Sequence, residues 1–375
     1  MQEENSNIAN EPDVEYEDLS GALMEKPFDP NKIDITTKTP SIDILIKRLK
    51  AEPAEIDLSP AFQRHSDLWD DEKQSRLIES ILIKFPLPAF YFDGSDNNNW
   101  LVVDGLQRLS SLRNFIILKK LKLKGLEFLR QLNGFKFDNL PRSLQRQIEE
   151  TQITAYIINK GTPEEVKFNI FQRINTGGLT LNSQEIRHAL NQGVPATFVA
   201  DLASLDEFKN ATDDALKPKR MLDREFVTRF LAFYLHPHNE YVPDLDTYMN
   251  SAMGELKKID TLQKQKIKDD FIKSLRLAKS IFGEWAFRKA DKYPEKRRPI
   301  NKALFEVWSV SLAKLDEIER KKLEDRKQIL FDKSIQLVKE DTEFFDSITI
   351  STGNKSSVAC RFLSIEKIIK ETLEI

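Results

Sequence analysis

A carboxylate, a glycine, an amide and a guanidinium lie within five residues of this chain, at Asp104, Gly105, Gln107 and Arg108. The apolar run Trp100–Val103 predicts a strand before them, and leucines at helical spacing predict a helix after them. A helix N-terminus presents unpaired backbone N–H groups and a partial positive charge, which suits a phosphate. The run therefore predicts either a phosphate site or a plain turn, in which Asp104 caps the helix and Arg108 is solvated.

Two further polar clusters are predicted to lie at the ends of elements. Gln63 and Arg64 follow a short strand. The other cluster follows a helix and contains Arg173, Asn175, Gly177 and Gly178. Arginine binds phosphate through two parallel hydrogen bonds, so three arginine-bearing motifs that meet would form a triphosphate site. Taken singly, Arg64 is more simply an exposed loop charge, and the Asn-Thr-Gly-Gly stretch a helix-terminating turn.

Hydrophobic periodicity predicts the elements that position these groups. The strands are expected at about 55–58, 89–92, 100–103 and 152–158. The helices around them are expected at about 41–49, 70–84 and 164–173. Thr162 is expected to cap the last of these, and Asn182 with Glu185 to form the capping box of another helix. Residues 121–146 are expected to be short irregular pieces.

The patterns divide the chain into three parts. Residues 1–38 are acidic and Asn-rich without a strand or helix period, so we expect a disordered tail. Residues 39–200 mix strand and helix patterns and should form an α+β domain that carries all three clusters. Residues 201–375 show only amphipathic helical patterns, which predict an all-α region with solvated outer faces.

Composition limits the function classes. The chain has 375 residues, with 57 Lys+Arg against 60 Asp+Glu and a net charge of -3, which gives no overall attraction to nucleic acid. One cysteine, Cys360, excludes an internal disulfide framework. His236 and His238 flank a proline, but no cysteine or acidic cluster stands nearby, so a metal site there is not favoured. No apolar run is long enough to span a membrane, and we expect a soluble, cytoplasmic protein.

The order of the motifs resembles the N-terminal domain family of the GmrSD restriction endonucleases, over about residues 41–235. The stretches that carry the resemblance are Phe62-Gln-Arg64, Trp69, Leu77-Ile-Glu-Ser-Ile81, Pro86-Leu-Pro88, Asp104-Gly-Leu-Gln-Arg-Leu109, Phe171-Gln-Arg-Ile-Asn175, Gly177-Gly178 and Leu181-Asn-Ser-Gln-Glu-Ile-Arg187. The resemblance implies a ParB/sulfiredoxin-like fold with a small mixed sheet and helices. It also implies binding of a nucleoside triphosphate (NTP), and in characterised members its hydrolysis, within prokaryotic defence against modified or foreign DNA.

The resemblance gives the motif residues expected roles. Asp104 would hold Mg²⁺ or orient water, with Gln107 and Arg108 beside it as catalytic residues. The nucleotide-binding residues would be Gln63, Arg64, Gly105, Arg173, Asn175, Gly177 and Gly178. Leu106 departs from the family motif, which usually has Gln at this place. If that Gln orients water or phosphate, this chain binds NTP without turnover; if Leu106 only changes the packing, hydrolysis is retained.

The resemblance also bears on partners. DNA and a separate nuclease or effector subunit are expected, because no histidine follows His238 to serve a His-based nuclease. Two functions remain open. One is an NTP-binding switch domain, with or without Mg²⁺-dependent NTPase activity, fused to a helical module. The alternative is a non-catalytic DNA-binding or protein-interaction module with a vestigial nucleotide pocket. A membrane partner is not expected.

Overall fold

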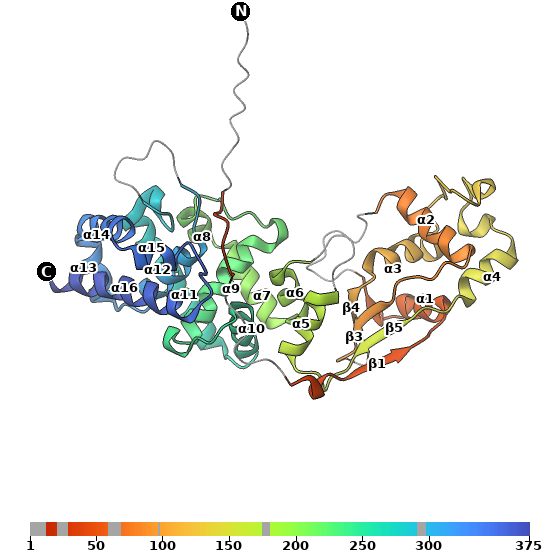
Figure 1. Ribbon diagram of the computed structural model, residues 1–375, viewed down its shortest axis with the longest axis horizontal. Coiled ribbons are helices and arrows are strands. Elements are labelled where there is room, and N and C mark those ends of the chain that lie inside the picture. Colours follow the sequence, from red (N-terminus) through yellow and green to blue (C-terminus); the bar gives the residue numbers. More distant parts are fainter. Residues whose placement is uncertain (1–12, 21–28, 59–68, 97, 175–180, 291–297) are drawn as a thin grey trace, which may run out of the picture. The chain divides into compact units, whose positions relative to one another are not determined.

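The computed structural model describes residues 13–20, 29–58, 69–96, 98–174, 181–290 and 298–375. The chain forms two compact units (Figure 1). Residues 28–190 form one, called here the sheet unit, and residues 1–27 with 191–375 form the other, called the helical unit. The sheet unit is therefore inserted into the sequence of the helical unit.

The sheet unit is built on a mixed five-stranded sheet in the order β1-β5-β3-β4-β2. Its strands are β1 (Ile35–Lys38), β2 (Ile56–Asp57), β3 (Phe90–Asp93), β4 (Trp100–Asp104) and β5 (Ala155–Ile158). The strands β3 and β4 form an antiparallel hairpin, and β2 runs parallel to β4. On the other side, β5 pairs parallel to β3 and antiparallel to β1. The β3–β4 hairpin thus lies inside the sheet, with β5 and β2 on its two sides.

Helices cover both faces of this sheet. They are α1 (Ile42–Lys50), α2 (Asp71–Leu82), α3 (Leu106–Leu112), α4 (Arg142–Glu150), α5 (Glu164–Ile174) and α6 (Ser183–Leu190), and a π-helical turn, Arg113–Ile117, continues α3. Because side chains alternate along a strand, each face has its own core. Phe92 and Val102 pack with apolar residues of α1 to α4, whereas Val103 and Ile158 pack with α5 and α6. The motif helix α3 and the helix α5 therefore lie on opposite faces.

The helical unit is made of ten α-helices among its described residues. They are α7 (Val194–Ser204), α8 (Asp206–Ala211), α9 (Leu222–Leu235), α10 (Leu245–Leu256), α11 (Thr261–Phe282), α12 (Lys302–Ala313), α13 (Glu317–Asp325), α14 (Lys327–Glu340), α15 (Thr342–Ser347) and α16 (Lys355–Glu374). Every residue of α12 after Lys302 is buried, so this helix is the centre around which α9, α11 and α16 pack.

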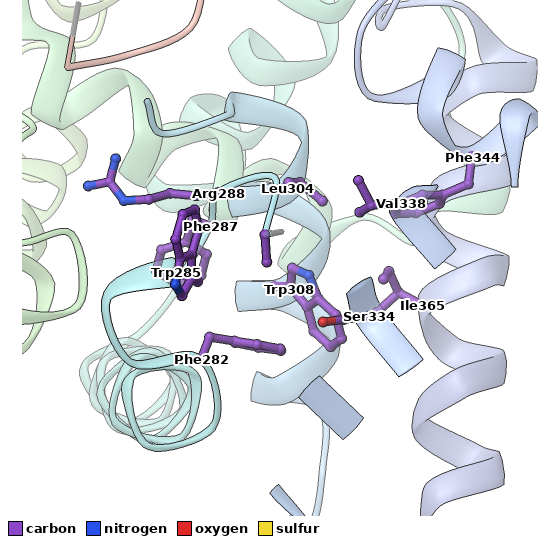
Figure 2. A pocket seen from close by; sticks show the side chains of 11 residues that line it. Phe282, Trp285, Phe287, Arg288, Leu304, Trp308, Ser334, Val338, Phe344 and Ile365 are labelled. Carbon is purple, nitrogen blue, oxygen red and sulfur yellow. The ribbon is translucent and has the colours of Figure 1, made fainter. Parts of the chain in front are cut away.

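The core of the helical unit is tightly packed. Figure 2 shows Phe282, Trp285, Trp308 and Ile365 around a cavity of about 10 Å³, which has room for about one water molecule and for no larger ligand. In the described part of the chain, no helix is both long and apolar enough to cross a membrane.

The α+β class is confirmed, as is the helical region that follows the sheet. Asp70 caps α2 by accepting a hydrogen bond from the N–H of Lys73 at 2.8 Å. One local prediction is confirmed in detail. Asn182 and Glu185 form the expected capping box, with both hydrogen bonds at 2.8 Å.

The prediction of a disordered tail over residues 1–38 is wrong where the structure describes that segment. β1 forms an edge of the sheet, and residues 13–20 pack in the helical unit. All four side chains of β1 are exposed, so the strand has no apolar pattern that the sequence could reveal. Thr162 does not cap α5 because its hydroxyl is bonded to the backbone N–H and carbonyl of Asp34, just before β1. Residues 1–12 and 21–28 lie outside the described residues.

One helix and one boundary also differ from expectation. α4 was not predicted, because its apolar face consists of only two residues, Leu144 and Ile148. The division between the units falls after Leu190 rather than after residue 200. The reason is that α7 buries Phe198, Val199 and Leu202 in the core of the helical unit.

Candidate functional site

The turn between β4 and α3 depends on a glycine. Gly105 is the N-cap of α3 and has a φ of 103°, in the left-handed region. A Cβ at this position would lie 2.5 Å from Cδ1 of Phe90 on β3. Backbone conformation and space therefore both require glycine. Since the N-cap is Gly105, Asp104 does not cap the helix, and the plain-turn interpretation loses its first part.

Arg108 is buried and ties the turn to the start of β3. It is 8% exposed, and its Nη2 donates to Asp104 Oδ2 at 2.8 Å and to the carbonyl of Ala89 at 3.1 Å. Its Nη1 donates to the carbonyl of Pro88, and the guanidinium lies 4.3 Å from the ring centroid of Phe90. Arg108 is thus not the solvated side chain of the plain-turn interpretation, and its donors are directed at protein acceptors.

Burial dominates the electrostatics of the Asp104–Arg108 pair. It raises the pKa of Asp104 even though Arg108 acts in the opposite direction. It also lowers the pKa of Arg108 against the attraction of Asp104. The Asp104 side chain keeps 25% exposure while that of Arg108 keeps 9%. The pair is therefore partly desolvated and incompletely balanced, with its carboxylate on the accessible side, a combination that is common at functional sites.

Tyr91 is a neighbour of this pair that the sequence did not single out. It pairs with Asp104 across the hairpin. Burial, followed by Tyr156 and Asp104, raises the pKa of its phenol. Its ring stacks on that of Tyr156 with 4.9 Å between the centroids. Alternation within β3 was the available signal, because it places Tyr91 on the opposite face from Phe90 and Phe92.

Gln107 is hydrogen-bonded to Trp69, a described residue just before α2. Its Oε1 accepts a hydrogen bond from the backbone N–H of Trp69 at 3.2 Å. The side chain of Gln74 on α2 donates to the carbonyl of the same Trp69 at 2.7 Å. Gln107 is thereby engaged in positioning Trp69, five residues after Arg64.

The structure places Asp104, Gly105, Gln107 and Arg108 together at the β4–α3 turn. It does not test whether the Arg64, Arg108 and Arg173 clusters meet. Arg173 is exposed in the last turn of α5, on the opposite face of the sheet from α3. The remaining nucleotide-binding candidates lie outside the described residues: Gln63, Arg64, Asn175, Gly177 and Gly178. Convergence of the arginines therefore stays a prediction.

A second polar cluster on the sheet was missed by the sequence analysis. Lys167 on α5 is 3% exposed, and its Nζ donates to Ser95 Oγ at 2.5 Å and lies 3.5 Å from Asp93 Oδ2. It fixes the β3–β4 loop to α5. Its position in an otherwise apolar stretch of α5 was the available signal. Among the described residues, no group of three or more His, Cys, Asp or Glu is placed to hold a metal, either here or at His236 and His238.

Residues 45–191 match the family model of the GmrSD restriction endonuclease N-terminal domain. This segment is a GmrSD N-terminal domain. The match confirms the family predicted from the motifs, contains the whole Asp104–Arg108 turn and covers the sheet unit except its N-terminal edge. The family match links this segment to DNA restriction. No curated protein and no solved structure matches the chain.

Proposed function

We propose that the GmrSD N-terminal domain of this chain binds a nucleoside triphosphate together with Mg²⁺ at the β4–α3 turn, within a restriction system directed at modified or foreign DNA. The observation that carries the proposal is the Asp104–Arg108 pair. It places an accessible, partly desolvated carboxylate next to Gly105, at the start of a helix.

The phosphates are proposed to lie at the backbone of this turn. The first N–H groups of a helix have no partner within the helix and attract anions. α3 and its π-helical continuation run from Leu106 to Ile117 and contribute their aligned dipoles. Gly105 takes the left-handed φ that turns the chain from β4 into α3. Arg108 supports the turn from beneath rather than reaching for the phosphate.

Asp104 fits Mg²⁺ only in company with the phosphates. Mg²⁺ usually keeps several waters and is bound by one or two carboxylates plus phosphate oxygens. Oδ2 of Asp104 already accepts a hydrogen bond from Arg108, and the positive charge of that guanidinium opposes a bare cation. We therefore expect Mg²⁺ to bind with the nucleotide and not alone, and to neutralise phosphate charge when bound.

We favour binding over hydrolysis, because an apolar side chain stands where the family usually has an amide. Leu106 is half-buried against the apolar core between the sheet and α1 to α4 and offers no polar group to a water or a phosphate. The amide oxygen of the adjacent Gln107 is engaged by Trp69. We propose a nucleotide-dependent switch with little turnover, whose output passes to DNA or to a separate nuclease or effector subunit.

Calorimetry on the full chain tests this proposal. Non-hydrolysable ATP and GTP analogues are titrated with and without Mg²⁺ into the wild type, Asp104→Asn and Asp43→Asn. Asp43 is an exposed carboxylate of α1 in the same unit and is the matched control. We expect Mg²⁺ to strengthen binding, with about a tenfold loss in Asp104→Asn (about 1.4 kcal/mol) and none in the control. Absence of binding at millimolar nucleotide by the folded wild type would sink the proposal.

A DNA titration separates the alternative function. Salt-sensitive DNA binding by a chain that binds no nucleotide would favour the non-catalytic module, because phosphate contacts weaken as salt rises.

A further inference from the structure

The segment of residues 13–18, called here the strap, adds to the helical unit as an extended strand would. Val14 forms a parallel bridge with Ile300. The N–H of Glu15 donates to the carbonyl of Ile300 at 2.8 Å, and the N–H of Ile300 donates to the carbonyl of Asp13 at 3.0 Å. Further along, the N–H of Thr352 donates to the carbonyl of Asp18 at 3.0 Å. Backbone pairing of this kind is a common way to bind an extended peptide.

Alternate side chains of the strap enter polar contacts. The Oε1 of Glu15 lies 2.5 Å from Nζ of Lys289, and its Oε2 accepts a hydrogen bond from Nδ2 of Asn301 at 3.0 Å. Tyr16, the next residue, is 90% exposed. Period-two alternation of this kind is what an extended segment bound along one side requires.

Glu17 forms the most buried contact of the strap. Its two carboxylate oxygens accept from the two terminal nitrogens of Arg229, with Nη1 to Oε1 at 3.0 Å. The hydroxyl of Thr352 donates to Oε1 at 2.9 Å. The side chains of Arg229 and Glu17 are 2% and 7% exposed, so this two-pronged pair is almost fully removed from water.

Glu17 also completes a charge balance. Among the described residues, the ion pairs around it join three cations, Arg229, Lys302 and Arg361, to two other anions, Glu225 and Glu306. Burial lowers the pKa of Arg229, but Glu17, Glu225 and Glu306 together raise it above its ordinary value. Removing Glu17 would leave a buried cation without its full compensation, which is strongly unfavourable. The cluster therefore needs an acidic group from outside the helices.

We infer that the helical unit contains a binding site for an extended acidic peptide with carboxylates two residues apart, and that the strap fills this site in cis. The residues that receive the peptide, called here the seat, are Arg229, Lys289, Ile300, Asn301, Lys302 and Thr352. A protein partner with an acidic segment of this kind competes with the strap.

Competition for the seat would affect the sheet unit, because that unit is inserted into the sequence of the helical unit. The sheet unit is joined to the helical unit at both of its chain ends, through residues 1–27 and through Asn191. Displacement of the strap releases the chain before the sheet unit from its place in the helical unit, while the chain connection at Asn191 is kept. A cavity of about 590 Å³ beside Glu15, lined also by Lys289, Lys339 and Phe345, offers a partner segment additional contacts.

Peptide binding to the full chain tests the inference. The probe is a fluorescent peptide with the sequence of residues 11–20, followed by anisotropy. A chain with Glu15→Gln and Glu17→Gln has a weakened strap and should bind the probe at least about tenfold more tightly than the wild type, whose seat is occupied at a millimolar effective concentration. Tyr16→Ser should match the wild type, because Tyr16 lies in the strap but is 90% exposed. A probe carrying both Gln substitutions should bind neither chain.

Two results of the peptide titration overturn the inference. One is failure of the folded double variant to bind the probe, and the other is equal binding by the double variant and the wild type. A second measurement needs no variant: unlabelled peptide at millimolar concentration should remove the hydrogen-exchange protection of the N–H groups of Glu15 and Thr352 in the wild type. Unchanged protection contradicts the inference.

Discussion

Arg108 in the sheet unit and Arg229 in the helical unit are both buried arginines, yet their charges are balanced differently. Arg108 meets one carboxylate and two backbone carbonyls. Arg229 meets the carboxylates of Glu17, Glu225 and Glu306. Burial accordingly lowers the pKa of Arg108, whereas that of Arg229 lies above its ordinary value because its three carboxylates outweigh burial.

This difference in charge balance distinguishes the β4–α3 turn, which can still accept a ligand, from the Arg229 cluster, whose charges are already paired. At the β4–α3 turn the acidic partner, Asp104, keeps a quarter of its side-chain surface exposed. In the helical unit Glu306 is fully buried between two arginines, and the remaining deficit is met by the strap. Incomplete compensation near the surface leaves room for chemistry, whereas complete compensation in the core serves stability.

The largest expected loss of stability comes from a substitution in the buried charge cluster around Arg229. Glu306→Gln removes the negative charge of the carboxylate that lies between Arg229 and Arg361. Two buried guanidinium groups then lack part of their compensating negative charge. We expect a loss of about 3–5 kcal/mol in the free energy of unfolding, measured by urea denaturation. Glu343→Gln, an exposed residue of α15, is the control and should change stability by less than about 0.5 kcal/mol. Similar losses in both variants would show that the cluster is not a buried charge network.

The next effect concerns the backbone of the candidate site. Gly105→Ala forces a side chain into the left-handed region and against Phe90, so we expect a loss of about 2–4 kcal/mol and of nucleotide binding. Gly134→Ala is the control, because Gly134 also has a positive φ of 86° but a Cβ there meets nothing within 4 Å. The control should cost about 1 kcal/mol. Equal losses of stability in the two variants, measured by thermal unfolding, would show that the contact between position 105 and Phe90 does not matter.

A smaller effect should depend on pH. Glu79 on α2 is buried and accepts hydrogen bonds from the backbone N–H groups of residues 127–129, at 3.0, 2.7 and 2.8 Å. Burial raises the pKa of Glu79, but these bonds and Arg76 outweigh it and hold the pKa below 4.5. A lowered folded pKa means that the stabilisation is present above about pH 4.5 and is lost as the pH falls through the folded value.

Glu79→Gln should therefore cost about 1–3 kcal/mol at pH 7, and the difference from the wild type should close as the pH falls toward 3. Urea denaturation at a series of pH values measures this. Glu72→Gln, on the same helix with a side chain that is 46% exposed, should show no such convergence. A cost for Glu79→Gln that stays constant with pH would mean that its charge is not what stabilises the loop.

The smallest effect on stability is expected at Leu106. Leu106→Gln restores the usual family residue at a half-buried position, so we expect a loss of about 1 kcal/mol in thermal unfolding. If Leu106 limits turnover, the variant releases phosphate from NTP faster than the wild type while binding it equally. Unchanged phosphate release with retained binding would show that another residue limits hydrolysis.

Local patterns predicted much of the sheet unit. The four predicted strands, the capping box of α6 and the Asp-Gly turn before α3 depend on neighbours within a few positions, so they can be recognised in sequence. β1 was missed because its four side chains are all exposed, and α4 because only Leu144 and Ile148 form its apolar face. At the site, the sequence identified Asp104 and Arg108 but not their burial, nor that Arg108 is used on the carbonyls of Pro88 and Ala89.

By itself, the sequence determined the α+β class, the helical region after it and the Asp104–Arg108 turn as the place of interest, because these follow from short-range periodicity and motif order. Only the tertiary structure decided that the acidic N-terminal segment belongs to the helical unit. Glu17 and Arg229 are 212 positions apart, and acidic composition alone predicts a solvated tail. A carboxylate is removed from water only where the fold supplies a buried cation to receive it, and that condition is set by packing rather than by local sequence.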